Sequence, residues 1–273
     1  MATAHGHTLK LNRALNHLKD LERGATTWLE NRDHHTITHE HDPDALTYSV
    51  FAEAERPPRD PAALLIGDFL HGVRSGLDHL AYALAVAYTN PLPEDVAEDS
   101  EFPIFGDEDR KGASGRGPDL FKGAASRKLR GVHPDARAFI ESVQPYKLGS
   151  RFAQHNLFLL YDLARIDRHR LLHPVVAFFS GFGFNPHSSR VKLGPGIIRS
   201  YEGSLEKRTE VALIEGVRPV NPGESVYVDV VLPLKLAFPA ESGAAAGKDV
   251  VKTLGAIYNY AITEVVTPLE AFL

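Results

Sequence analysis

The amino-acid sequence predicts an α+β protein in which a helical bundle carries an appended antiparallel β-sheet. Apolar residues recur at three- and four-residue spacing over long segments, which is the period of helices with one buried face. Other segments consist of short β-branched and aromatic runs divided by glycine, proline and asparagine, as is typical of strands and turns. The helical segments are 8–30, 61–89, 134–173 and 248–272, and the β segments are 34–55 and 175–240.

The chain has 273 residues, of which 43% are hydrophobic and 24% charged, as in an ordinary globular protein. Because the first and the last helix both belong to the predicted bundle, we expect residues 1–273 to form a single domain. The formal net charge of -5 argues against a generally basic nucleic-acid-binding protein. The chain has no cysteine, which excludes disulfides and thiolate catalysis and fits the cytoplasmic location that we expect. With no apolar run near 20 residues and no signal-peptide pattern, we expect no contact with a membrane.

A β-hairpin is predicted to follow the first helix, because HTITHEH and ALTYSVFAEA are extended runs separated by Asp42-Pro43-Asp44. Strand alternation places His35, His39 and His41 on one face. Two interpretations of this face remain open. It is either a metal site or a solvated, histidine-rich edge strand.

The segment 61–89 is the longest predicted helix, and it begins with Pro61 after a capping Asp60. Gly72 and Gly76 lie four residues apart, where a second helix could approach closely. One arc of the helix is apolar and the opposite arc combines acids, bases and histidines. The apolar arc contains Phe69, Leu70, Val73, Leu77, Leu80, Ala81 and Leu84, and the polar arc contains Asp68, His71, Arg74, Ser75, Asp78, His79 and Tyr82.

The segment between the long helices carries the strongest local positive charge. Glu101-Phe-Pro-Ile-Phe105 is a short apolar stretch that we expect to anchor this segment to the core. Residues 106–131 form either a phosphate-binding surface or a solvated loop. Their basic residues are Arg110, Lys111, Arg116, Lys122, Arg127, Lys128 and Arg130.

A second polar stripe is predicted on the helix over 153–173, which Pro174 should end. Asp162, Arg165, His169 and His173 follow one another at spacings of three, four and four. Because buried charges need partners, we expect this stripe to face the polar arc of the long helix.

Arg74-Ser-Gly-Leu-Asp-His79 resembles the R-x(4–6)-H signature of the HEPN superfamily. The superfamily consists of helical-bundle domains, and many of them are metal-independent ribonucleases of toxin, defence or RNA-processing systems. The resemblance implies a HEPN-like helical core, a catalytic pair of Arg74 and His79, and Ser75 at the polar position after the arginine. A histidine can move the 2′-hydroxyl proton while an arginine holds the phosphate.

The favoured hypothesis is therefore a metal-independent endoribonuclease that uses no cofactor, binds RNA and forms a homodimer. Other familiar motifs, such as a phosphate-binding glycine loop or HExxH, are absent from the sequence. The candidate catalytic residues are Arg74, His79, Asp78 and His169. The candidate substrate-binding residues are Ser75, Arg165, Arg170, Lys128 and Arg130.

The chain is also similar to a group of uncharacterised bacterial proteins that share four motifs, and this similarity spans about the first two thirds. The motifs are a GD-x(4)-LRSxLDH helix, an FPI segment, a QPY segment and an IDKHR helix. In this sequence they correspond to residues 67–79, 102–104, 144–146 and 166–170, with Arg168 where a lysine is usual.

Two further functional classes remain open. A hydrolase or other small-molecule enzyme would bind a divalent metal through Asp78, His79, His169 and His173. A non-catalytic binding or scaffold protein would instead use its charged residues as a buried salt-bridge network between helices, formed by Arg74, Asp78, Asp162 and Arg165.

Overall fold

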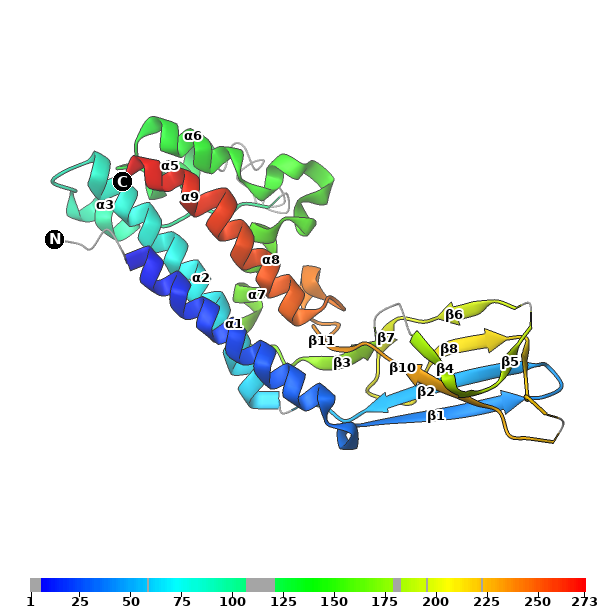
Figure 1. Cartoon of the computed structure of the whole chain (residues 1–273). Helices are drawn as coiled ribbons and strands as arrows, with labels where there is room; N and C mark the ends of the chain where they lie inside the picture. The colour runs from blue at the N-terminus through cyan, green and yellow to red at the C-terminus, as the bar shows by residue number, and fades with distance from the viewer. Residues whose placement is uncertain (1–5, 58, 107–120, 179–182, 195, 222) are drawn as a thin grey trace.

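The protein is a rod of packed helices from one end of which a set of small antiparallel sheets extends (Figure 1). The computed structural model describes residues 6–57, 59–106, 121–178, 183–194, 196–221 and 223–273. The prediction of an α+β protein is confirmed. Among the described residues, no helix is long and apolar enough to cross a membrane.

Two antiparallel helices form the backbone of the bundle. α1 (Gly6–Glu30) leads into the β region, and α2 (Arg59–Tyr88) returns from it alongside α1. The predicted apolar arc of α2 is buried at every one of its positions. Gly72 and Gly76 of α2 face α1, since a Cβ at Gly72 would lie 3.0 Å from the Cβ of Ala14 and a Cβ at Gly76 would lie 2.8 Å from Cγ of Leu11. The expected close approach of a second helix is confirmed.

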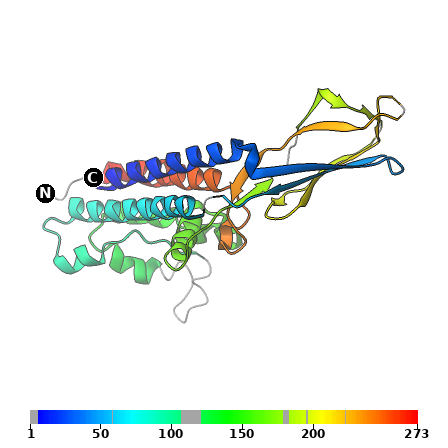
Figure 2. The same ribbon diagram turned by 90° about the horizontal axis from the view of Figure 1, so that it is seen from below.

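The rest of the bundle comes from the middle and the end of the chain. α7 (Asn156–Asp167) packs against α2 and against α8 (Val250–Tyr260). The helical path of α8 continues through η6 (Ala261–Val266), α9 (Thr267–Leu269) and η7 (Glu270–Phe272). It ends beside the start of α1, where His7 Nε2 lies 3.3 Å from Glu270 Oε1. Both ends of the described chain therefore lie far from the sheets (Figure 2).

Shorter elements cover the same far end of the bundle. They are α3 (Glu94–Asp99), η3 (Phe121–Ala125), α5 (Ser126–Lys128), α6 (Pro134–Ser142) and η4 (Pro145–Gln154). The predicted helical stretch 134–173 is thus interrupted between α6 and α7.

α7 also ends at Asp167, six residues earlier than expected. Leu172 is buried, and Arg170 donates a hydrogen bond to the backbone oxygen of Glu241. These long-range contacts direct the chain toward the sheets before Pro174 is reached.

The predicted early hairpin is present, and it belongs to the largest sheet. The hairpin consists of β1 (His35–Asp42) and β2 (Thr47–Ala54), and the short helix η1 (Arg32–His34) precedes it. The sheet also contains β8 (Thr209–Glu215) and β6 (Ile198–Ser200), and its strand order is β1-β2-β8-β6. All pairs are antiparallel, and Val50 lies opposite both His39 and Ala212.

The expected single sheet over 175–240 is divided into smaller ones. β10 (Tyr227–Val231) pairs with β4 (Gly183–Arg190), and β5 (Lys192–Leu193) pairs with β9 (Val217–Arg218). β11 (Leu234–Ala237), β3 (Val175–Phe178) and β7 (Gly203–Ser204) form the three-stranded sheet nearest the helices. The division follows the turn residues, because glycine and proline interrupt a strand ladder.

One continuous core joins the helices and the sheets. It includes Leu11 of α1, Leu77 of α2, Leu254 of α8 and Ile214 of β8. Tyr48 of β2 contributes to it, and its hydroxyl accepts a hydrogen bond from the backbone N–H of Val228. The β region is therefore packed onto the bundle through shared apolar contacts.

Candidate functional site

The first candidate residue, Arg74, is part of a half-buried ionic network on one flank of α2. Its guanidinium pairs with Asp78 at 3.3 Å and also hydrogen-bonds to Glu101. Lys128 of α5 donates to the other carboxylate oxygen of Glu101. Asp78 also accepts a hydrogen bond from the backbone N–H of Phe102 at 3.0 Å. The network therefore links α2 to the apolar stretch 101–105, which is anchored as expected.

The charges of this network oppose the desolvation of its acids. Burial raises the pKa of Asp78 above its usual value, although Arg74 acts in the opposite direction. Burial also acts to raise the pKa of Glu101, but the hydrogen bonds and charges of Lys128 and Arg74 outweigh it and hold that pKa below its usual value. Glu101 is therefore the anionic centre of the network, and the charges of Arg74 and Lys128 are largely compensated.

The second candidate residue, His79, lies on the other flank of α2. At about 100° per residue, five positions place it about 140° from Arg74 around the helix. Its exposed imidazole lies beside Gly6, in an open hollow that α1 lines with Lys10, Asn12, Arg13 and Asn16. Ser75 and Asp78 occupy the half-buried strip between the two flanks. Helix geometry thus separates Arg74 from His79 instead of pairing them directly.

The two charged stripes do not face each other as expected. Asp162 of α7 pairs with Arg165 at 2.7 Å and accepts a hydrogen bond from the backbone N–H of Ala244 at 3.1 Å. Neither of these bonds leads from Asp162 to the polar arc of α2. The prediction was wrong because α7 turns this stripe toward the loop before α8.

The polar arc of α2 instead meets α7 at the next acidic residue along the chain. A Cβ at Gly67 would lie 2.7 Å from Asp167 Oδ2. Burial raises the pKa of Asp167, the charge of Asp68 raises it further, and His71 lowers it. These residues come from the GD and IDRHR motifs, so the structure brings two of the four shared motifs together.

The remaining candidate cations have their own partners or positions. Arg130 lies 2.9 Å from Asp95 and 3.4 Å from Asp99, and Arg170 donates to the backbone of Glu241. His169 is exposed in the turn after α7. Of the predicted basic surface, Arg110, Lys111 and Arg116 lie outside the described residues.

The alternative metal ligands are not gathered. Within the part of the chain that the structure describes, no three His, Asp or Glu side chains are placed to hold a metal ion. His79 lies beside α1, whereas His173 lines a cleft next to the sheets. This arrangement contradicts the ligand set of Asp78, His79, His169 and His173.

The histidine face of β1 does exist. His35, His39 and His41 alternate with exposed residues on an edge strand, and His39 contacts the rings of Tyr48 and Tyr227. Burial is the main cause that lowers the pKa of His35 and of His39. This face is therefore partly covered by aromatic rings and is not simply solvated.

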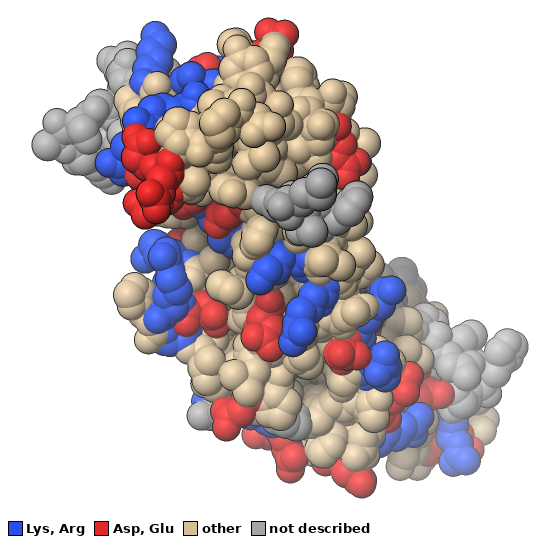
Figure 3. Space-filling view, turned by 90° about the vertical axis from the view of Figure 1, so that its left-hand side faces the viewer, with Lys and Arg blue, Asp and Glu red and all other residues tan. Residues whose placement is uncertain are grey.

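Charge is mixed over the end of the bundle where α1 begins. Figure 3 shows Lys and Arg side chains interspersed with Asp and Glu there. A nucleic-acid contact on such a surface depends on a few local cations. The sequence alone did not single out Lys10 and Arg13, because the polar face of α1 has the pattern of an ordinary solvated helix. The predicted helix crossing at Gly72 and Gly76 was the signal that could have placed α1 beside His79.

The chain matches no protein-family model, no curated protein and no solved structure at a significant level. Its function is therefore inferred from its own residues.

Proposed function

We propose that the protein is a metal-independent ribonuclease whose centre is His79, with Lys10 and Arg13 of α1 as the phosphate-binding cations. The observation that carries the proposal is that this exposed imidazole shares one hollow with both cations. The resemblance of residues 74–79 to the HEPN signature supports the same class of activity.

The chemistry requires a titratable base and a positive charge beside it. In the neutral form, His79 would accept the proton of a ribose 2′-hydroxyl, and the resulting oxygen would attack the adjacent phosphorus. Lys10 and Arg13 would stabilise the charge that develops on the phosphoryl oxygens. The bond to the 5′-oxygen then breaks, which leaves a 2′,3′-cyclic phosphate, and that oxygen takes a proton from water. The hydroxide left behind takes the proton from His79 and restores the neutral imidazole.

Arg74 has a different role in this proposal from the one that the motif implied. Its charge is shared with Asp78 and Glu101, so it is poorly available to a phosphate. We assign Arg74 a positioning role, in which its ionic network holds the flank of α2 opposite His79 in place.

The test is cleavage of single-stranded RNA by the purified full-length protein in the presence of EDTA. We expect His79→Ala to reduce the rate by about 10² or more, because general acid–base catalysis contributes about 10² to 10⁴. Arg13→Ala should reduce it less and make it more sensitive to salt. His169→Ala is the matched control, since His169 is also exposed but lies outside the hollow. A wild-type protein without activity, or equal losses in both histidine variants, would contradict the proposal.

The same preparation tests the expected homodimer by light scattering, with and without RNA. A dimer would double the number of His79 centres in each particle, but the proposed chemistry needs only one.

A non-catalytic binding or scaffold protein is the second candidate. The compensated network of Arg74, Asp78, Glu101 and Lys128 favours it, because such a network braces helices without needing a substrate. In that case no RNA is cleaved, and RNA binding is insensitive to His79→Ala.

A further inference from the structure

A cleft of about 710 Å³ opens where the helices meet the sheets, and it shares no lining residue with the hollow at His79. It is formed by residues 173–177 at the start of β3, 202–206 around β7 and 237–247 after β11, and Arg56 completes it. Small-molecule sites commonly have about 300–1,000 Å³ and favour junctions of this kind. The size and position of the cleft are those of a ligand site.

The floor of the cleft is apolar and built on paired strands. Val175 lies opposite Ala237 in the pairing of β3 with β11, and Ala177 lies opposite Ser204 in the pairing with β7. Phe238 closes the floor and is only 1% exposed. A ligand lying on this surface would therefore contact mostly hydrocarbon.

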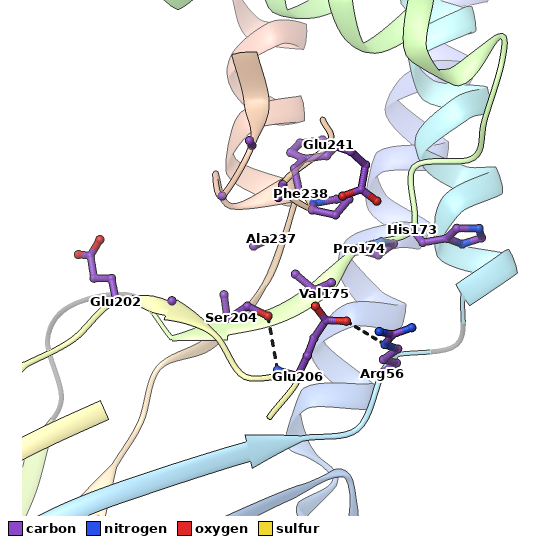
Figure 4. A pocket seen from close by; sticks show the side chains of 16 residues that line it. Arg56, His173, Pro174, Val175, Glu202, Ser204, Glu206, Ala237, Phe238 and Glu241 are labelled. Carbon is purple, nitrogen blue, oxygen red and sulfur yellow. Dashed lines mark hydrogen bonds and ion pairs between the residues drawn. The ribbon is translucent and has the colours of Figure 1, made fainter. Parts of the chain in front are cut away.

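The rim of the cleft is acidic. Its charged lining side chains among the described residues are three glutamates and one arginine, and Arg56 pairs with Glu206 at 2.8 Å. Figure 4 shows the carboxylates of Glu206 and Glu241 extending into the cleft from opposite sides, whereas the imidazole of His173 points away from its middle. These three acids and one base give the charged lining side chains a formal charge of -2.

Glu241 is the carboxylate best placed to receive a ligand. Its backbone oxygen is held by Arg170, which fixes the residue. Its carboxylate makes no hydrogen bond or ion pair with the described residues. An exposed carboxylate that makes no direct ion pair, at the edge of an apolar floor, attracts a cation that carries a hydrocarbon chain.

We propose that this junction cleft binds a small aliphatic amine of the polyamine type, with one ammonium group between Glu206 and Glu241 and its methylenes on the Val175–Phe238 floor. The site is independent of the ribonuclease centre. An anionic ligand would meet repulsion from the rim, and a neutral one would leave Glu241 without a partner.

Isothermal titration of the full-length protein with spermidine at low ionic strength tests the proposal. We expect one molecule to bind per chain, and a neutral diol of similar length not to bind. Glu241→Gln should weaken binding at least about fivefold, because hydrogen bonds to charged groups are stronger than neutral ones. Ala240→Trp should abolish binding, since Ala240 is an exposed lining residue and its replacement fills the cleft.

Glu22→Gln is the matched control, because Glu22 is exposed on α1 and removing it changes the net charge equally. Retained binding in this variant, with loss in the two cleft variants and unchanged circular dichroism, supports the site. Absence of spermidine binding, binding that survives Ala240→Trp, or an equal loss in Glu22→Gln would overturn it.

Discussion

The guanidinium of Arg74 lies against the carboxylate of Glu101, a residue 27 positions further along the chain. Lys128 holds the second oxygen of the same carboxylate, so Glu101 connects α2 with α5. Buried and half-buried charges of this kind cost desolvation free energy that their partners must offset. The first expected consequence of this arrangement is structural: removal of one partner leaves the others uncompensated.

Arg74→Ala should therefore destabilise the fold. We expect the free energy of unfolding to fall by about 1–3 kcal/mol, less than for a fully buried pair, because Glu101 is partly exposed. Arg13→Ala is the control, and its exposed side chain should change the stability by less than about 0.5 kcal/mol. Urea denaturation measures both variants, and equal stabilities would show that the network does not support the fold.

A second prediction concerns the start of α7, which His155 caps with its side chain. Its Nδ1 accepts a hydrogen bond from the backbone N–H of Leu157, and its Nε2 lies 3.1 Å from the hydroxyl of Tyr260. An accepting Nδ1 must be unprotonated. Burial accordingly lowers the pKa of His155 to about 4.

The free energy of unfolding should consequently decrease as the pH is lowered through a defined range. The unfolded chain binds a proton at His155 below about pH 6.5, while the folded chain does so only near pH 4, so acidification favours unfolding between these values. His155→Asn keeps a capping oxygen but cannot titrate there. We expect the stability difference between wild type and this variant to shrink from pH 6.5 to 4 in thermal unfolding. A difference that is constant with pH would contradict the cap.

The sequence predicted the helices well, because their apolar periodicity extends over many turns. Every apolar position assigned to one arc of α2 is buried, and Gly72 and Gly76 do meet α1. Periodicity reports which residues share a face, and a helix as long as α2 repeats that signal several times. The short strands after residue 175 repeat it once or twice, so their division into separate sheets could not be foreseen.

The candidate site was predicted less well. Helical spacing did predict the local pairs Arg74–Asp78 and Asp162–Arg165. Periodicity does not identify the neighbour that a face will meet, and the further partners of these residues come from distant segments at Glu101 and Ala244. Which distant residue becomes the partner depends on where the loops return to the bundle. Spacing rules therefore could not predict these distant partners, and the expected contact between the two stripes failed for this reason.

The helix crossing of α1 and α2 gives a third prediction. A Cβ at Gly76 would lie 2.8 Å from Cγ of Leu11, which is only 2% exposed. Gly76→Ala should lower the free energy of unfolding by about 1–3 kcal/mol, because overpacking outweighs the gain in helix propensity. Gly255→Ala in α8 is the matched substitution, since nothing lies within 4 Å of its Cβ position. The free energy of unfolding of the Gly255→Ala variant should rise by about 0.5–1 kcal/mol. A rise in both variants would show that α1 can move away from α2.

The last prediction separates backbone strain from a steric contact in the loop before α8. Gly243 has a φ of 58°, and a Cβ there would lie 2.3 Å from Oδ2 of the buried Asp162. Gly223 has a φ of 84° but open space at its Cβ position.

An alanine in the left-handed region costs about 1–2 kcal/mol, and we expect the free energy of unfolding of Gly223→Ala to fall by about that much. Gly243→Ala should lose about 1–3 kcal/mol more, because it also displaces Asp162 from the backbone N–H of Ala244 and leaves a partly buried donor unpaired. Parallel urea denaturation of the two variants measures the difference. Equal losses would mean that Asp162 rotates away freely and that its bond to Ala244 does not stabilise the loop.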